Sequence, residues 1–121
     1  MAKSQPRSAL DPSEVPARLH EIAELLRGTH HLGPEAQQAL AEFADELGNI
    51  LNQATAPPPE AAPLVESTGH VVEALHQEQG TTQVTAARSR LQELAAEFDA
   101  RAPRVADFAR RLLDALANLG I

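Results

Sequence analysis

The sequence predicts an all-α protein whose helices pack as a helical bundle or in coiled-coil-like pairs, and three observations support this. Apolar residues recur at alternating steps of three and four over long stretches, which is the spacing of one helix face. Proline and glycine stand mostly at the ends of these stretches. Much of the 43% hydrophobic content is alanine, which favours helix. We expect a disordered arm, a helical hairpin, a proline-rich linker with a weak helix, and a heptad-patterned C-terminal helical segment, at residues 1–12, 13–54, 55–83 and 84–121.

The hairpin is predicted from two amphipathic stretches joined by a short loop. Ser13 is the expected N-cap of a helix over 14–27, which Gly28 ends. Pro34 suits the first position of a second helix, over 34–54. A connection of six residues between two such helices favours an antiparallel pair.

The linker separates this hairpin from the C-terminal segment. Four prolines within 55–63 favour extended polyproline II structure and oppose regular helix. Helical spacing returns over 64–79, but Ser67, Thr68 and Gly69 are poor helix formers. We therefore expect a weak, partly ordered helix there.

The C-terminal segment carries a seven-residue apolar rhythm that keeps its register. Its members predict a seam that packs against another helix, formed by Leu91, Leu94, Phe98, Val105, Phe108, Leu112 and Leu119. Pro103 lies inside the rhythm, so the helix either kinks there or stops near Arg101 and restarts; the unbroken register favours the kink. Arg101, at a seam position, either marks the bend or faces a partner carboxylate. Gly120 and Ile121 are typical of a helix stop.

Arginines flank the seam on one side. Arg90, Arg104 and Arg111 share the heptad position that meets the charges of a partner helix. Glu46 occupies the corresponding flank of the second helix. We hypothesise that these arginines face acidic residues of the first hairpin or of a second subunit.

Composition limits the classes of partner. Leu, Ile, Val and Phe make up only 28 of 121 residues, so a monomer has a small core and self-association would enlarge it. A net charge of −7 and the lack of Tyr and Trp argue against nucleic acid as a partner. No stretch approaches the roughly 18 apolar residues of a membrane span, and residues 1–10 lack the apolar core of a signal peptide. We expect a cytoplasmic protein with no membrane partner.

The sequence predicts no catalytic residue, no metal ligand and no cofactor. Cysteine is absent, which excludes thiolate chemistry. His70 and His76 lie six positions apart and face different sides of a helix, and no other pair of histidines has a metal-binding spacing. Ser67 and His70 are the nearest nucleophile and base in sequence, but no acid is placed to orient them.

Four peptides resemble a family of short bacterial helical proteins catalogued as a domain of unknown function, DUF4404. They are LHEIAELL, GPE, EFDARAP and LDALANLGI, at residues 19–26, 33–35, 97–103 and 113–121. The resemblance covers roughly 14–54 and 84–121, and 55–83 looks like an enlarged linker. Asp99 stands where the family usually has Glu, and Ala102 where His is common. The resemblance implies an all-α fold and brings no known activity or cofactor.

The predicted function is a non-catalytic structural or protein-interaction module that self-associates through heptad seams, or that binds another helical protein. The alternative is a small-molecule or metal-dependent enzyme or regulator. An enzyme needs a pocket where several polar groups converge, and a chain with three Phe and no Tyr or Trp offers little for one. Nucleic-acid binding is less favoured still.

Overall fold

The part of the chain that the structure describes forms a bundle of five α-helices. The computed structural model describes residues 12–29, 32–53, 59–77 and 81–118. A 3-10 turn, η1 (Pro12–Glu14), leads into α1 (Val15–Arg27), α2 (Pro34–Gln53), α3 (Ala61–His76), α4 (Thr81–Glu97) and α5 (Pro103–Asn118). The residues described contain no strand, and the all-α prediction is confirmed. Apart from Pro12, the expected arm 1–12 lies outside them.

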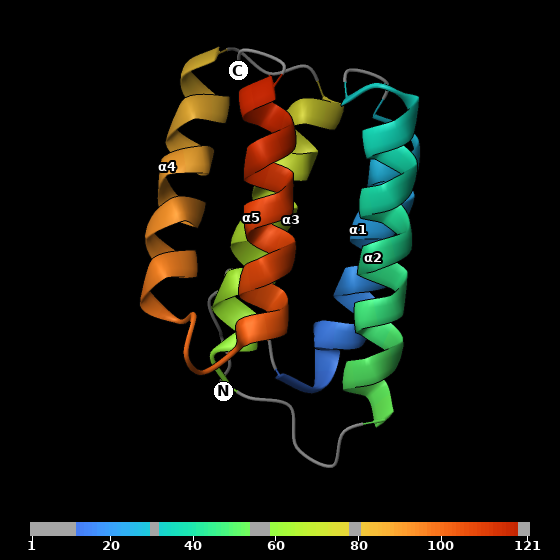
Figure 1. The fold of residues 1–121 in the computed structure, drawn as a ribbon, viewed down its shortest axis with the longest axis vertical. Coiled ribbons are helices and arrows are strands. Elements are labelled where there is room, and N and C mark those ends of the chain that lie inside the picture. The colour runs from blue at the N-terminus through green and yellow to red at the C-terminus, as the bar shows by residue number, and fades with distance from the viewer. Residues whose placement is uncertain (1–11, 30–31, 54–58, 78–80, 119–121) are drawn as a thin grey trace, which may run out of the picture.

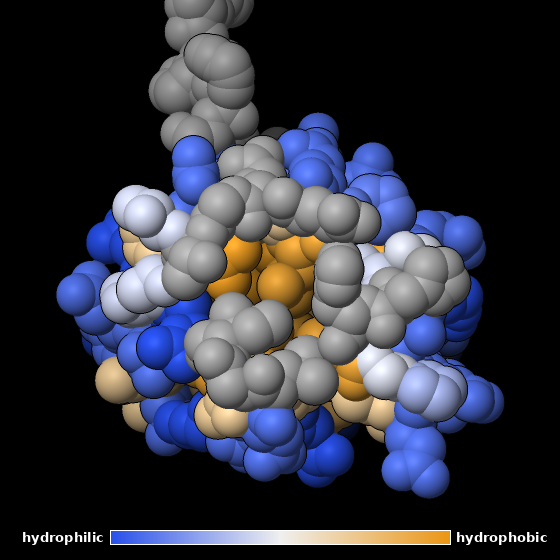
Figure 2. Space-filling model, turned by 90° about the horizontal axis from the view of Figure 1, so that it is seen from above, coloured by the Kyte–Doolittle hydropathy of each residue, from blue (hydrophilic) through white to orange (hydrophobic). Residues whose placement is uncertain are grey.

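The helices run alternately up and down (Figure 1). α1 packs against α2 on one side and α3 on the other, α4 packs against α3 and α5, and α5 returns to α2. The ring is thereby closed, and a contact between α3 and α5 crosses its middle. Seen from the end of the bundle where α5 finishes, apolar side chains fill the centre and hydrophilic ones surround them (Figure 2).

The helix ends follow the expected prolines and differ in their caps. Pro34 begins α2 as predicted, and Pro16 lies in the first turn of α1, where a missing N–H costs little. Ser13 is not the N-cap, because it lies within η1 and Glu14 caps α1 without a side-chain hydrogen bond. Gly28 does end α1, with a φ of −95°. The left-handed glycine of this loop is Gly33, with a φ of 84°.

The segment expected to hold a weak helix at 64–79 forms α3, one of the most buried helices of the bundle. Ser67, Thr68 and Gly69 are all buried in it. The Thr68 hydroxyl donates to the Leu64 carbonyl oxygen at 2.8 Å, so its polar group is satisfied inside the helix. Burial between α1, α4 and α5 therefore outweighs the low helix propensity of these residues.

The helix breaks at Pro103, so the favoured kink is wrong and the stop and restart is correct. α4 ends at Glu97, and α5 begins at Pro103 itself and runs back alongside α4. The Ala102 N–H bonds the Phe98 carbonyl oxygen, and the Ala106 N–H bonds that of Ala102, both at 2.9 Å. The register continues across the break because both helices turn their apolar faces to the same core.

Candidate interaction surface

The predicted seam is the interior of this chain and not a free surface. Its described members Leu91, Leu94, Val105, Phe108 and Leu112 are buried in the core. Phe98 is partly buried against that core, and Leu119 lies outside the described residues. A second subunit therefore has no access to the seam.

The flanking arginines are exposed and do not meet carboxylates of the hairpin. Arg111 does reach α2, but its Cζ lies 4.8 Å above the ring of Phe43, a cation–π contact. Its Nε donates to Asp107 on its own helix at 3.2 Å. Neither Arg90 nor Arg104 makes an ion pair with another described residue.

Arg101 faces a carboxylate of its own chain and not one of a partner. Its Nη1 lies 3.0 Å from Glu60 Oε2, so the pair ties the α4–α5 turn to the residue that precedes α3. A backbone hydrogen bond and this arginine hold the pKa of Glu60 below its usual value. The proposed helix stop, Gly120 and Ile121, lies outside the described residues.

A groove between α2 and α5 has a hollow near each end. The hollow of about 300 Å³ is lined mainly by apolar residues of α2 and by polar residues of α5: Leu32, Ala36, Ala39, Leu40, Phe43, Arg111, Asp114, Ala115 and Asn118. The hollow of about 210 Å³ at the other end is almost wholly apolar and is lined by Ile50, Leu51, Ala102, Pro103, Arg104 and Val105. Phe43 lines the hollow of about 300 Å³, and its ring centroid lies 5.6 Å from that of the buried Phe108.

The α2 side of the groove carries a second apolar stripe beside the buried one. The buried stripe is Leu40, Ala44, Leu47 and Leu51. The second stripe is apolar except for Glu46, and none of its members is buried: Ala36, Ala39, Phe43, Glu46 and Ile50. Ile50 is 37% exposed and is the large apolar residue that stands exposed in the described chain. The sequence carried a signal for this, because apolar residues cover two adjacent faces of residues 34–54.

The α5 side of the groove carries alternating charge. Arg104, Asp107, Arg111 and Asp114 recur at steps of three, four and three, so they lie on one helix face. Asp107 is half-buried and the other three are exposed. These two stripes and the hollows between them are called here the α2–α5 face.

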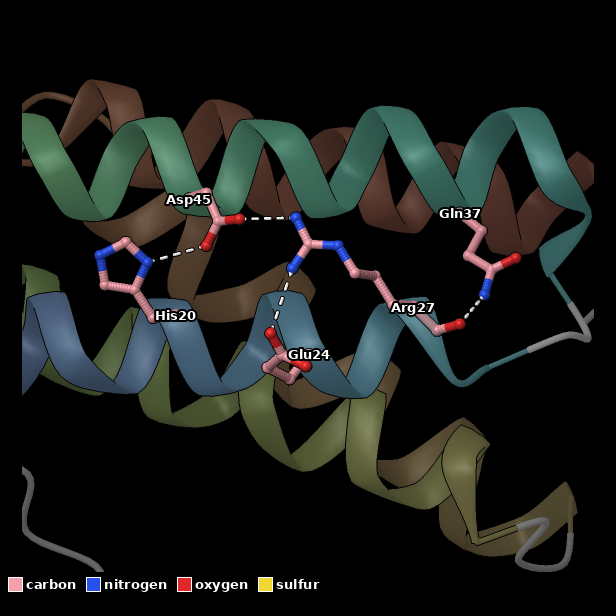
Figure 3. Close-up of polar contacts among 5 residues, drawn as sticks. All are labelled: His20, Glu24, Arg27, Gln37 and Asp45. Carbon is pink, nitrogen blue, oxygen red and sulfur yellow. Dashed lines mark hydrogen bonds and ion pairs between the residues drawn. The ribbon is translucent and has the colours of Figure 1, made fainter.

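A polar cluster on another side of the molecule joins α1 to α2 (Figure 3). The Asp45 carboxylate accepts a hydrogen bond from Arg27 Nη2 at 2.6 Å, and it lies 2.8 Å from His20 Nδ1. Arg27 also pairs with Glu24, and its carbonyl oxygen accepts from Gln37. Burial raises the pKa of Asp45, but the hydrogen bonds from Arg27 and His20 outweigh it and leave the pKa lowered. These interactions hold the two helices of the hairpin together.

Two glycines let long polar side chains of α1 lie against neighbouring helices. A Cβ on Gly48 of α2 would stand 3.0 Å from His20 Nε2, and one on Gly69 of α3 would stand 2.4 Å from Arg18 Nη2. The guanidinium of Arg18 crosses Gly69 and bonds Glu73 at 3.0 Å. These two glycines, which weaken their own helices, thus lie where side chains of α1 contact α2 and α3.

The described histidines are dispersed. His20 belongs to the hairpin cluster, His76 lies beside Gly28, and His70 is exposed. Among the residues described, no group of three His, Cys, Asp or Glu is placed to hold a metal ion. Within the same residues, no helix is long and apolar enough to cross a membrane.

The family model of DUF4404, a domain of unknown function, matches residues 37–121. This chain belongs to the DUF4404 family. The DUF4404 match takes in α3 and the enlarged linker, which the resemblance in sequence had set aside, and leaves out α1. It covers nearly all of α2 and all of α5, and so both sides of the α2–α5 face. No curated protein and no solved structure matches the chain significantly.

Proposed function

We propose that this DUF4404 protein is a non-catalytic helical module that associates with a second copy of itself through the α2–α5 face. The observation that carries the proposal is the second stripe of α2, which presents Phe43 and Ile50 beside two mainly apolar hollows. Apolar side chains grouped at a groove favour association with another protein. The net charge of −7 argues against nucleic acid as that partner.

The surface differs from the one that the heptad pattern indicates. The heptad seam of α4 and α5 is not available to a partner, because its residues form the core of the monomer. The partly exposed stripe of α2 remains for a partner. Two of the three flanking arginines, Arg104 and Arg111, border the α2–α5 face, so the proposal places them beside the interface.

Light scattering of the wild-type chain and of Ile50→Asp tests the proposal. We expect the wild type to show twice the 12.9 kDa chain mass, and the variant to shift toward the monomer. Because Ile50 is 37% exposed in the monomer, burying the remainder contributes roughly 0.5–1 kcal/mol per copy. Burying an Asp charge from each copy at the interface costs more, so the substitution weakens association by about 100-fold or more. The helical circular dichroism should be unchanged, because Ile50 is outside the core.

Ala86→Asp is the matched control, since it adds the same charge at an exposed position of α4 away from the face. It should leave the mass as in the wild type. A wild-type mass of one chain at every concentration up to millimolar would refute the proposal. Leu112→Asp is no substitute for Ile50→Asp, because Leu112 is fully buried and its loss would unfold the chain.

A further inference from the structure

We infer that the two copies pack with their helices antiparallel, about a two-fold axis perpendicular to α2 and α5 at the level of Phe43. In this arrangement Ile50 of each copy enters the larger hollow of the other, beside Ala36. The inference rests on the proposed self-association and specifies its geometry. It follows from three features of the α2–α5 face.

The first feature is that α2 and α5 share a common midpoint. The ring of Phe43 lies 5.6 Å from that of Phe108 and 4.8 Å below Arg111 Cζ. The middle of the α2 stripe is therefore level with residues 108–111 of α5. One axis at this height can act on both helices.

The second feature is that Ile50 and the hollow of about 300 Å³ lie at equal distances from that midpoint. Ile50 and Ala36 each lie seven residues from Phe43, about 10.5 Å along the helix in opposite directions. A two-fold rotation about the axis exchanges the two positions. It therefore places the exposed Ile50 of one copy at the hollow of about 300 Å³, lined by Ala36 and Ala39, in the other. Such self-complementarity is what an isologous interface requires.

The third feature is the charge order of α5, which becomes complementary under the same rotation. Arg104 and Asp114 lie five residues to either side of Ala109, and Asp107 and Arg111 lie two residues to either side. Antiparallel α5 helices centred on Ala109 thus place each arginine of this stripe opposite an aspartate. The bond from Arg111 to Asp107 of its own chain is compatible with this, because a guanidinium has five N–H donors.

Charge also distinguishes this register from its neighbours. Sliding α5 by one charged position would set arginine against arginine and aspartate against aspartate. Like charges across an interface are unfavourable, so the alternating order selects one register. A two-fold axis parallel to the helices would instead bring Ile50 of one copy against the Arg104 end of α5 in the other.

Disulfide trapping tests the geometry, since the natural chain has no cysteine. We expect an oxidised equimolar mixture of Ile50→Cys and Ala36→Cys to form a linked dimer at least 10-fold faster than either variant alone. A disulfide needs Cβ atoms about 4 Å apart, and the proposed axis brings the mixed pair to the same level along the helices. Two copies of Ile50 would stand about 21 Å apart, twice the seven-residue rise.

Glu35→Cys mixed with Ile50→Cys is the matched control, because Glu35 is the exposed neighbour of Ala36 and points away by one helical step. Ile50→Cys mixed with Arg104→Cys reports the axis parallel to the helices. Linking that is faster in the Glu35 mixture or in the Arg104 mixture than in the Ala36 mixture overturns the antiparallel geometry. Fast linking of Ile50→Cys with itself overturns it as well. If the dimer exists and depends on Ile50, yet the Ala36 mixture does not link, the geometry fails and the proposed function stands. If the wild type is a monomer, both the antiparallel geometry and the proposed function are wrong.

A charge exchange provides an independent measurement on α5. Arg104→Asp with Arg111→Asp makes one variant whose stripe is wholly acidic, and Asp107→Arg with Asp114→Arg makes one that is wholly basic. Each variant alone should remain a monomer by light scattering, and their equimolar mixture should restore the dimer. A mixture that stays monomeric, while both variants keep their helicity, contradicts the pairing of α5 with α5.

Discussion

At the scale of single residues, Gly69 shows why a helix-weakening residue stands in the middle of α3. Its missing side chain leaves room for the Arg18 guanidinium, whose side chain is only 16% exposed and which bonds Glu73. Propensity alone makes Gly less favourable than Ala here by about 1 kcal/mol. An added Cβ would overlap the guanidinium, which would have to shift, and we expect the weakened contact with Glu73 to reverse that preference.

We predict that Gly69→Ala lowers the free energy of unfolding by roughly 0.5–2 kcal/mol, since a charge-assisted hydrogen bond outweighs the propensity gain. In the Arg18→Ala background the same substitution should raise it by up to about 1 kcal/mol, because nothing then occupies the space. Urea denaturation of the four chains measures the coupling. Equal effects of Gly69→Ala in both backgrounds would show that the guanidinium does not depend on this glycine.

The lowered pKa of Asp45 predicts that the stability of the protein depends on pH. Its pKa is lowered in the folded chain, so the unfolded chain binds its proton more readily. The stability that Asp45 contributes is therefore fully present above its unfolded pKa of about 3.9 and is lost as pH falls through the lower folded value. The difference in unfolding free energy between the wild type and Asp45→Asn should accordingly be positive near neutral pH and shrink below about pH 4.

Urea denaturation at a series of pH values measures this difference. Glu93→Gln is the control, because Glu93 is exposed on α4, away from the α2–α5 face, and makes no ion pair with another residue that the structure describes. A wild-type advantage over Asp45→Asn that persists unchanged to pH 3 would contradict the role of Asp45.

At the scale of elements, the break between α4 and α5 is decided by burial and not by the proline alone. One continuous helix over residues 84–118 would be about 52 Å long, whereas α5 alone spans about 24 Å. Such a helix would leave much of its apolar face without neighbours. Folding back places Leu91 and Leu112 in the same core, and Arg110 then reaches Asp99 of the turn at 2.8 Å.

We therefore expect Pro103→Ala to leave α4 and α5 separate. The variant should lose only about 0.4–1 kcal/mol of stability, because alanine gives the unfolded chain more freedom. Its helical circular dichroism and its radius of gyration by small-angle scattering should match the wild type. A gain in helicity together with a more elongated particle would show that the proline itself holds the two helices apart.

At the scale of the whole molecule, the bundle sorts apolar residues into those that fold the chain and those left for a partner. The strongest heptad signal, in α4 and α5, faces inward and is complete within one chain. A weaker stripe on α2, with Phe43 and Ile50, borders the groove where α2 meets α5. In this chain the stronger apolar periodicity therefore marks residues that are buried in the core. The residues proposed for association come from the weaker pattern on α2.

The sequence by itself determined the all-α class, the start of α2 at Pro34, and the helical nature of each amphipathic stretch. These properties are local, because the spacing of apolar residues and the restricted backbone of proline act within a few positions. Only the tertiary structure decided that Gly69 and Thr68 belong in a buried helix, that the chain reverses before Pro103, and that the seam is internal. Those outcomes depend on which faces meet across the bundle, and periodicity along one helix carries no information about its partner.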